Sequence, residues 1–191
     1  LSLGANAFVI GLIAAIQQGA NMLQLRAFHS LEQHGNRKAM AVRYATSARL
    51  VWVLICAVTF VTAEPFGSYR LWIFLALFTI SVSLGIFSYV PWTSWLVDLV
   101  PERVRGRFFA QRNLAAGAVG VVLGVGAGSF IDFWNGAALG PAPYAFVVLL
   151  AFGVVFGLFA VSIQNRMYHP PYPKSESEQT FWESLKRPFK D

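Results

Sequence analysis

The polar side chains that could do chemistry form two groups, amides within an apolar stretch and charges between apolar stretches. The amides lie at spacings close to multiples of the 3.6-residue helical repeat, and so share one helical face: Asn6, Gln17, Asn21 and Gln24. Such a face could line a hydrated cavity for a small molecule. Alternatively, the amides could hydrogen-bond across a helix interface, at about 1 kcal/mol or less each. Both interpretations stay open for Gln17 and Asn21, whereas an interface is favoured for Asn6 and Gln24.

The second group is a dense cluster of charges between residues 98 and 112. Asp98 ends a run free of charge that begins at Leu71, and Pro101 prevents a helix from continuing smoothly. Four arginines follow before the next apolar run: Arg103, Arg105, Arg107 and Arg112. Ion pairs that break on opening can make such a region bistable, although each exposed pair contributes only about 0.2–1 kcal/mol. The alternative is that these arginines only set the orientation in a membrane.

Residues suited to catalysis or metal binding are sparse. The only cysteine, Cys56, lies within an apolar stretch and is interpreted as a packing residue. His29 and His34 lack further ligands at a compatible spacing, so they are interpreted as solvated loop histidines. An intramembrane enzyme would need a nucleophile with a base, or a set of metal ligands. We therefore expect no enzyme, no catalytic residue, no metal site and no cofactor.

The elements that must position these groups are membrane-spanning helices. Of the 191 residues, 56% are hydrophobic and only 13% are charged, against roughly 25% charged in a soluble domain. Spanning a hydrocarbon core of about 30 Å takes roughly 20 helical residues. The sequence predicts five such spans, at about 1–25, 44–63, 71–98, 113–131 and 144–163.

We expect an all-α polytopic membrane protein, because backbone in lipid must satisfy its own hydrogen bonds and no alternating strand pattern is present. Residues 1–164 form the predicted bundle, and residues 165–191 form a polar segment in which a short amphipathic helix begins near Thr180. The chain opens directly into a span without a basic leader, so this segment is not predicted to be a signal peptide. We expect the chain to be a fragment of a longer protein.

The basic residues predict an orientation. Fourteen of the 15 lysines and arginines lie in or beside the segments 26–43 and 99–112 or in the C-terminal tail, and Arg70 is the exception. The positive-inside rule places these segments in the cytoplasm and the loops 64–70 and 132–143 outside, in a plasma or inner membrane. The net charge of +6 is therefore a topology signal rather than evidence for nucleic-acid binding.

Two further features concern packing within the spans. Arg49 lies about one turn inside the second predicted span, where it could extend toward headgroups or pair with Glu32 or Asp98. The fourth span carries glycines that would allow another helix to approach closely: Gly117, Gly120, Gly124 and Gly128. No carboxylate or histidine lies at mid-depth in the five spans, so a proton carrier would have to lie elsewhere in the complete protein.

Two charged loops resemble those of the major facilitator superfamily, whose members have twelve spans in two halves. Residues 32–38, Glu-Gln-His-Gly-Asn-Arg-Lys, are similar to the motif between its second and third helices, although Phe28 stands where that motif has its first glycine. The pattern Asp98-x-x-Pro-Glu-x-x-Arg-Gly-Arg107 is similar to the loop between its fourth and fifth helices. The fifth-helix antiporter signature is only half present, because Val125 replaces its proline.

This resemblance implies the second to sixth helices of a secondary transporter that works by alternating access, with the eighth to twelfth helices as a competing register. It implies a small-molecule substrate, possible ion coupling and, as partners, lipid and the missing helices of the same transporter. It also implies a cytoplasmic charge network: Glu32, Gly35, Arg37, Asp98, Arg105, Gly106, Arg107 and Arg112. A non-transporting membrane scaffold or receptor is the alternative.

Overall fold

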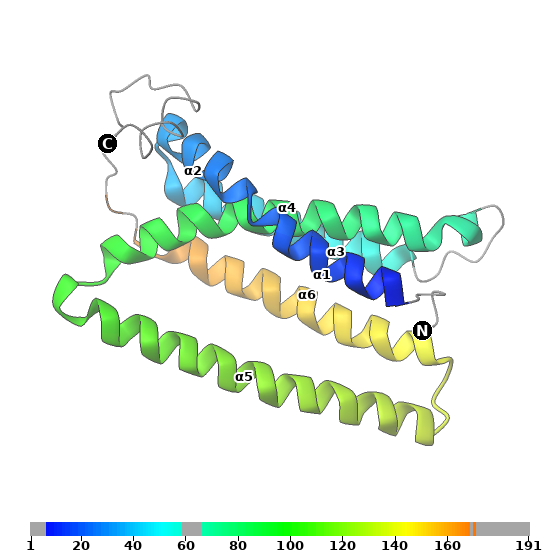
Figure 1. Ribbon diagram of the computed structural model, residues 1–191. Coiled ribbons are helices and arrows are strands. Elements are labelled where there is room, and N and C mark those ends of the chain that lie inside the picture. The colour runs from blue at the N-terminus through cyan, green and yellow to red at the C-terminus, as the bar shows by residue number, and fades with distance from the viewer. Residues whose placement is uncertain (1–6, 59–65, 169, 171–191) are drawn as a thin grey trace.

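The computed structural model describes residues 7–58, 66–168 and 170 of the chain. In this part every regular element is an α-helix (Figure 1): α1 Ala7–Ala20, α2 Leu23–His34, α3 Arg37–Val58, α4 Phe66–Leu99, α5 Glu102–Gly136 and α6 Ala142–Arg166. Five helical segments are long and apolar enough to cross a membrane, with α1 and most of α2 forming one of them. The prediction of an all-α membrane protein with five spans is therefore confirmed for the described residues.

The first span is interrupted between α1 and α2. Around Gly19 to Met22 the backbone forms i→i+3 hydrogen bonds, such as Met22 N to Gly19 O at 3.1 Å, in place of the regular α-helical ladder. Amide side chains bridge the same interruption, because Asn21 donates to Gln18 and Gln24 donates to Asn21 at 3.4 and 3.2 Å. The amides thus bond along their own chain at this bend.

The helices extend further than the predicted spans, because charged residues continue them beyond the apolar core. The predicted loop 26–43 is mostly helical: α2 runs to His34 and α3 begins at Arg37. Gly35 closes α2 in a left-handed conformation with φ 67°, and the Asn36 side chain caps α3 by accepting from the Ala39 amide at 3.0 Å.

The predicted loop 99–112 is likewise shortened to a turn at Val100 and Pro101, after which α5 begins at Glu102. Proline lacks an amide hydrogen but tolerates the position that precedes a helix, so Pro101 ends α4 without preventing α5 from starting at once. The four arginines therefore lie on a helix rather than in a loop. The amphipathic helix expected near Thr180 lies outside the described residues.

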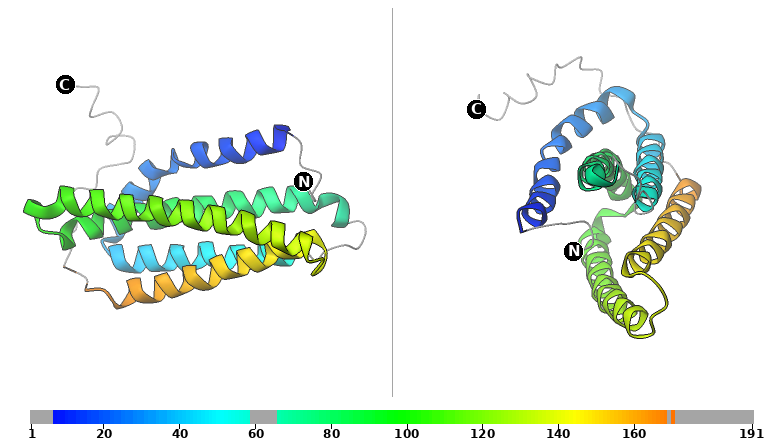
Figure 2. Two further views of the ribbon diagram at one scale, coloured as in Figure 1. Left: turned by 90° about the horizontal axis from the view of Figure 1, so that it is seen from below. Right: turned by 90° about the vertical axis from the view of Figure 1, so that its right-hand side faces the viewer.

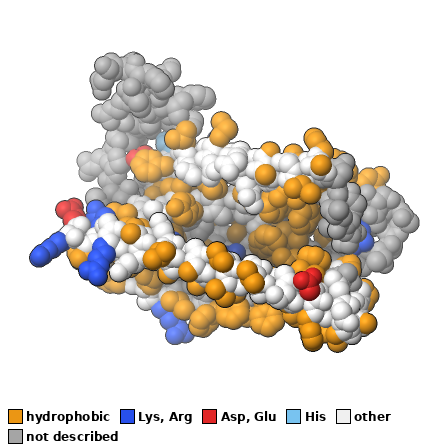
Figure 3. All heavy atoms as spheres, turned by 60° about the horizontal axis from the view of Figure 1, so that its bottom comes forward, with side chains coloured by type: hydrophobic (Ala, Val, Ile, Leu, Met, Phe, Trp, Pro, Cys, Tyr) orange, Lys and Arg blue, Asp and Glu red, His pale blue; other side chains and the backbone are white. Residues whose placement is uncertain are grey.

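The helices follow an open curve rather than a closed bundle. α4 packs against α1, α2 and α3, α3 also packs against α6, and α5 packs mainly against α6. Seen end-on, α4 lies between the arc of α1 and α2 and helix α3, and α6 and α5 follow from α3 along the curve (Figure 2). The helix ends near residues 35, 100 and 167 meet at one end of the molecule, here called the basic end, where most basic side chains in view gather (Figure 3).

The tightest packing joins α3 and α4. Ala41 and Ala48 are buried on α3, and opposite them Ser88 donates to the Ala41 carbonyl at 2.9 Å and Ser81 to the Ala48 carbonyl at 3.3 Å. The two alanines are seven residues apart on α3, and the two serines are seven residues apart on α4. The same faces of the antiparallel helices therefore meet every two turns. Small side chains let the two backbones approach closely enough for these hydrogen bonds.

Candidate functional site

A buried ion pair ties α3 to α4 at the basic end. The Arg37 side chain is 1% exposed, and its Nη1 donates to Asp98 Oδ2, to the Ser94 carbonyl at 3.1 Å and to Ser94 Oγ at 3.2 Å. The last carbonyls of α4 carry the negative end of its dipole, which favours a cation there. Arg37 and Asp98, 61 positions apart, are thus brought together as one contact.

The chain that leaves α6 is held to the same end by two more side chains. Lys38 Nζ donates to the Met167 carbonyl and Trp95 Nε1 donates to the Tyr168 carbonyl, both at 3.0 Å. Trp95 is fully buried. The start of α3 and the C-terminal ends of α4 and α6 are therefore joined at the basic end.

Other members of the expected charge network lie apart from this contact. Within the described residues no ion pair joins Glu32, Arg105, Arg107 or Arg112 to another side chain. Gly106 has open space around it, and Gly35 acts as the turn glycine between α2 and α3. Of the expected network, only Arg37 and Asp98 are thus paired in the part of the chain that the structure describes.

A cavity of about 770 Å³, here called the central cavity, is lined by residues of α1, α3, α4, α5 and α6. Its polar lining includes Gln17, Ser88 and Gln164, and its aromatic lining includes Trp52 and Trp92. Two cationic side chains, Arg49 and Arg112, also line it, and none of the lining residues is acidic. The cavity therefore combines positive charge, hydrogen-bonding groups and aromatic surface.

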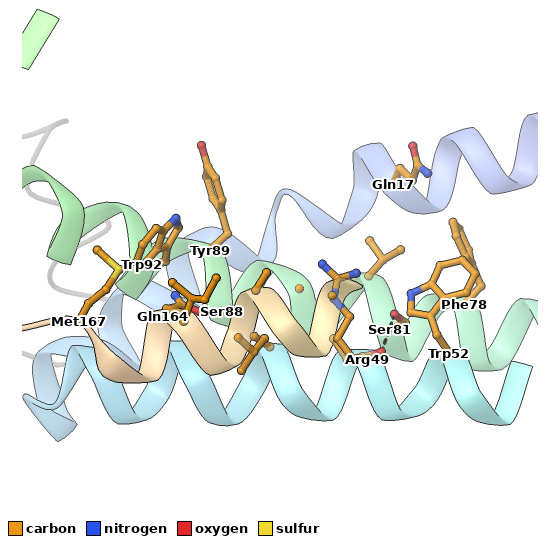
Figure 4. Close-up of a pocket in the computed structure, with 18 of the residues that line it drawn as sticks. Gln17, Arg49, Trp52, Phe78, Ser81, Ser88, Tyr89, Trp92, Gln164 and Met167 are labelled. Carbon is orange, nitrogen blue, oxygen red and sulfur yellow. Dashed lines mark hydrogen bonds between the residues drawn. The ribbon is translucent and has the colours of Figure 1, made fainter. Parts of the chain in front are cut away.

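Arg49 reaches this cavity by passing directly over the backbone of α6. A Cβ atom built on Gly157 would lie 2.5 Å from Arg49 Nε and 2.7 Å from Arg49 Cδ. Arg49 is twelve residues after the start of α3, about 18 Å along the helix, and so lies near the middle of α3. Figure 4 shows it between the Trp52–Phe78 pair and the side chains of Ser88 and Gln164.

A cation within a membrane span is costly unless it is hydrated or paired. Placing an arginine at the centre of a span costs about 2.5–3.5 kcal/mol on insertion scales. Glu32 and Asp98, the two partners expected from sequence, make no ion pair with Arg49 within the described residues. The Arg49 charge is therefore left facing the cavity, where water or an anion can stabilise it.

The amide face predicted from sequence is divided. Gln17 lines the cavity, whereas Asn21 and Gln24 are exposed and hydrogen-bond near the α1–α2 bend. Asn6 lies outside the described residues. Within the described residues, Gln17, Asn21 and Gln24 form no hydrogen bond to a facing helix, so the interface interpretation finds no partner helix for them.

The glycines of α5 face open space. Nothing lies within 4 Å of a Cβ built on Gly117, Gly120, Gly124 or Gly128, and no residue of α5 is buried in the described part of the chain. The predicted close approach of another helix therefore does not occur among these elements.

Several lining residues were not singled out as cavity residues from sequence, namely Ser81, Ser88, Trp92 and Gln164. Ser81 and Ser88 share the seven-residue spacing of a packed seam, which could have placed them on one face of α4. Nothing in the sequence indicates that this face meets α6. Within the described residues no group of three or more His, Cys, Asp or Glu could hold a metal ion.

Comparison with known proteins gives no match, since no family model, curated protein or solved structure is similar to this chain. The described part of the chain is all-helical, with five helices long and apolar enough to span a membrane. Function is therefore inferred from the residues of the cavity and the basic end.

Proposed function

We propose that this chain is part of a secondary active transporter of the major facilitator type, corresponding to the second to sixth helices of its N-terminal half. A small molecule would bind in the central cavity, and alternating access would expose that cavity to one side of the membrane at a time. The basic end would face the cytoplasm by the positive-inside rule.

The observation that carries this proposal is the position of the cavity relative to the Arg37–Asp98 contact. The cavity is lined from five helices, and the contact joins two of those helices, α3 and α4, at the basic end. An ion pair at one end of a cavity can stabilise one of two conformations, because opening that end requires the pair to break.

The test uses cysteine labelling in the full gene product with Cys56→Ala. Single cysteines replace Gln17, Ser88 or Gln164 in the cavity, and Val155→Cys on the exposed surface of α6 is the control. A membrane-impermeant thiol reagent is added from each side. We expect the three cavity positions to react several-fold faster than position 155, which would lie in lipid.

The same labelling in the Asp98→Asn background tests gating. A loss of about 1 kcal/mol from one conformation changes the ratio of two states about fivefold, so the labelling rates from the two sides should change in opposite directions by that order. Cavity positions that never react would instead favour a dry interface and a scaffold. Labelling that Asp98→Asn leaves unchanged would contradict alternating access.

A further inference from the structure

We propose that the central cavity binds a small organic anion, a carboxylate or a phosphate ester on an apolar, ring-sized body, through Arg49. This inference rests on the proposed function, because it names the class of molecule that such a transporter would carry. Its first support is the charge of the lining, which includes the cations Arg49 and Arg112 and no carboxylate.

Within the residues that the structure describes, no carboxylate lies beside Arg49 near the middle of α3. The described carboxylates, Glu32, Asp98, Glu102 and Asp132, lie near the ends of their helices. The remaining acidic residues in the sequence, at positions 64, 176, 178, 183 and 191, lie outside the apolar segments. A mobile anion entering the cavity would supply the missing charge, and charge-assisted hydrogen bonds to a guanidinium are strong and directional.

The side chains around Arg49 indicate the shape and polarity of the ligand as well as its charge. Trp52 and Phe78 meet edge to face on one side of it, with ring centroids 6.2 Å apart, and Trp92 lies beyond Ser88 on the other side (Figure 4). Aromatic side chains favour flat apolar groups, while Ser88 and Gln164 can hydrogen-bond polar substituents. A cavity of about 770 Å³ is within the range of small-molecule sites.

Gly157 leaves open the space that the Arg49 side chain occupies. Any side chain at 157 would contact the guanidinium region, since the added Cβ would lie 2.5 Å from Nε. Arg49 is flexible, so Gly157→Ala should displace its guanidinium rather than separate α3 from α6. Gly153, one turn earlier on α6, has nothing within 4 Å of an added Cβ and provides a matched control.

The experiment measures protection of Gln164→Cys from the thiol reagent in the full gene product with Cys56→Ala. The probes are benzoate and phenyl phosphate, with benzyl alcohol and benzylammonium as neutral and cationic controls. We expect saturable protection by the two anions and not by the controls. Equal protection by benzyl alcohol would overturn the proposal, because an apolar cavity alone would explain it.

Variants then assign the effect to Arg49. Arg49→Gln should weaken anion protection about tenfold or more, and Arg49→Lys should retain part of it, because lysine keeps the charge but loses the forked geometry. Gly157→Ala should weaken protection about threefold, and Gly153→Ala by less than twofold. Unchanged anion affinity in Arg49→Lys, Arg49→Gln and Gly157→Ala together would refute the site, and Gly157→Ala remains informative where Arg49→Gln fails to fold.

The same experiment tests where the counter-charge of Arg49 comes from. If a carboxylate on another helix of the complete protein pairs with Arg49, added anions give no protection, and this proposal falls. The proposed function is tested separately by labelling without any probe. Gated labelling without anion protection would keep the transporter and remove its anionic substrate, whereas anion protection without gating would keep the site and remove the transporter.

Discussion

The α3–α4 pair and α5 are equally suited to a membrane by composition, yet they pack in opposite ways. On the α3–α4 seam, alanines are buried, serines donate to carbonyls of the facing helix, and Arg37 closes one end. On α5 no residue is buried, and its glycines face open space. Small residues therefore permit close approach but do not by themselves cause it, because in lipid the attraction comes from packing and polar contacts.

The largest difference between the two regions should come from Arg37→Ala. This change removes the buried cation and its bonds to Ser94 and Asp98, and we expect the free energy of unfolding to fall by about 2 kcal/mol or more. Because Asp98 is 47% exposed, water can partly stabilise the carboxylate that remains, which limits the loss.

Unfolding in mixed micelles, followed by circular dichroism, measures this effect. Arg107→Ala on α5 is the control, since Arg107 is exposed and makes no ion pair within the described residues. Equal stability of the Arg37 and Arg107 variants would show that the contact at the basic end contributes nothing to the fold.

A smaller effect is expected from enlarging one alanine in each region. Ala41 is fully buried on the seam, so Ala41→Leu should cost about 1–3 kcal/mol by overpacking. Ala118→Leu, the same change on the exposed surface of α5, should leave unfolding within about 0.5 kcal/mol of the parent. Equal losses in the full gene product would mean that a helix outside the described residues covers α5, and the contrast would then hold only within this chain.

The smallest effect concerns one hydrogen bond of the seam. Ser88→Ala removes the bond to the Ala41 carbonyl and should cost about 0.6 kcal/mol, the average for such bonds between membrane helices. Ser83→Ala is the matched control, because Ser83 donates at 2.8 Å to Thr79 of its own helix. A double variant with Ala41→Leu should be less than additive if both changes act on the same seam. Full additivity would place them on independent contacts.

Helix positions could be predicted from sequence more fully than helix partners could. The apolar runs locate all five spans, but they underestimate helix length where charges follow, as with the arginines at the start of α5. Charged residues are good helix formers, so they continue a helix into water after the apolar core has ended. Runs of hydropathy detect only the part within lipid.

The candidate site was harder to predict than the spans. For Gln17 the sequence leaves both a cavity and an interface open, and the structure places it at the cavity. Asn21 and Gln24 share its helical face but hydrogen-bond near the α1–α2 bend. A helical face is defined by spacing alone, whereas a cavity needs several faces to converge. Arg49 lies one turn inside the predicted span but near the middle of α3, because charged residues extend that helix seven residues before the apolar run.

The sequence by itself determined that the described part of this protein is helical, that it has five helices long and apolar enough to span a membrane, and that its basic residues gather at alternate helix ends, because these properties depend on local composition and helix length. Only the tertiary structure decided that Arg37 meets Asp98, that α3 and α4 share a seam, and that Arg49 passes over Gly157 into a cavity. Those contacts join residues 33 to 108 positions apart. They depend on which helices become neighbours, and no local pattern encodes that choice.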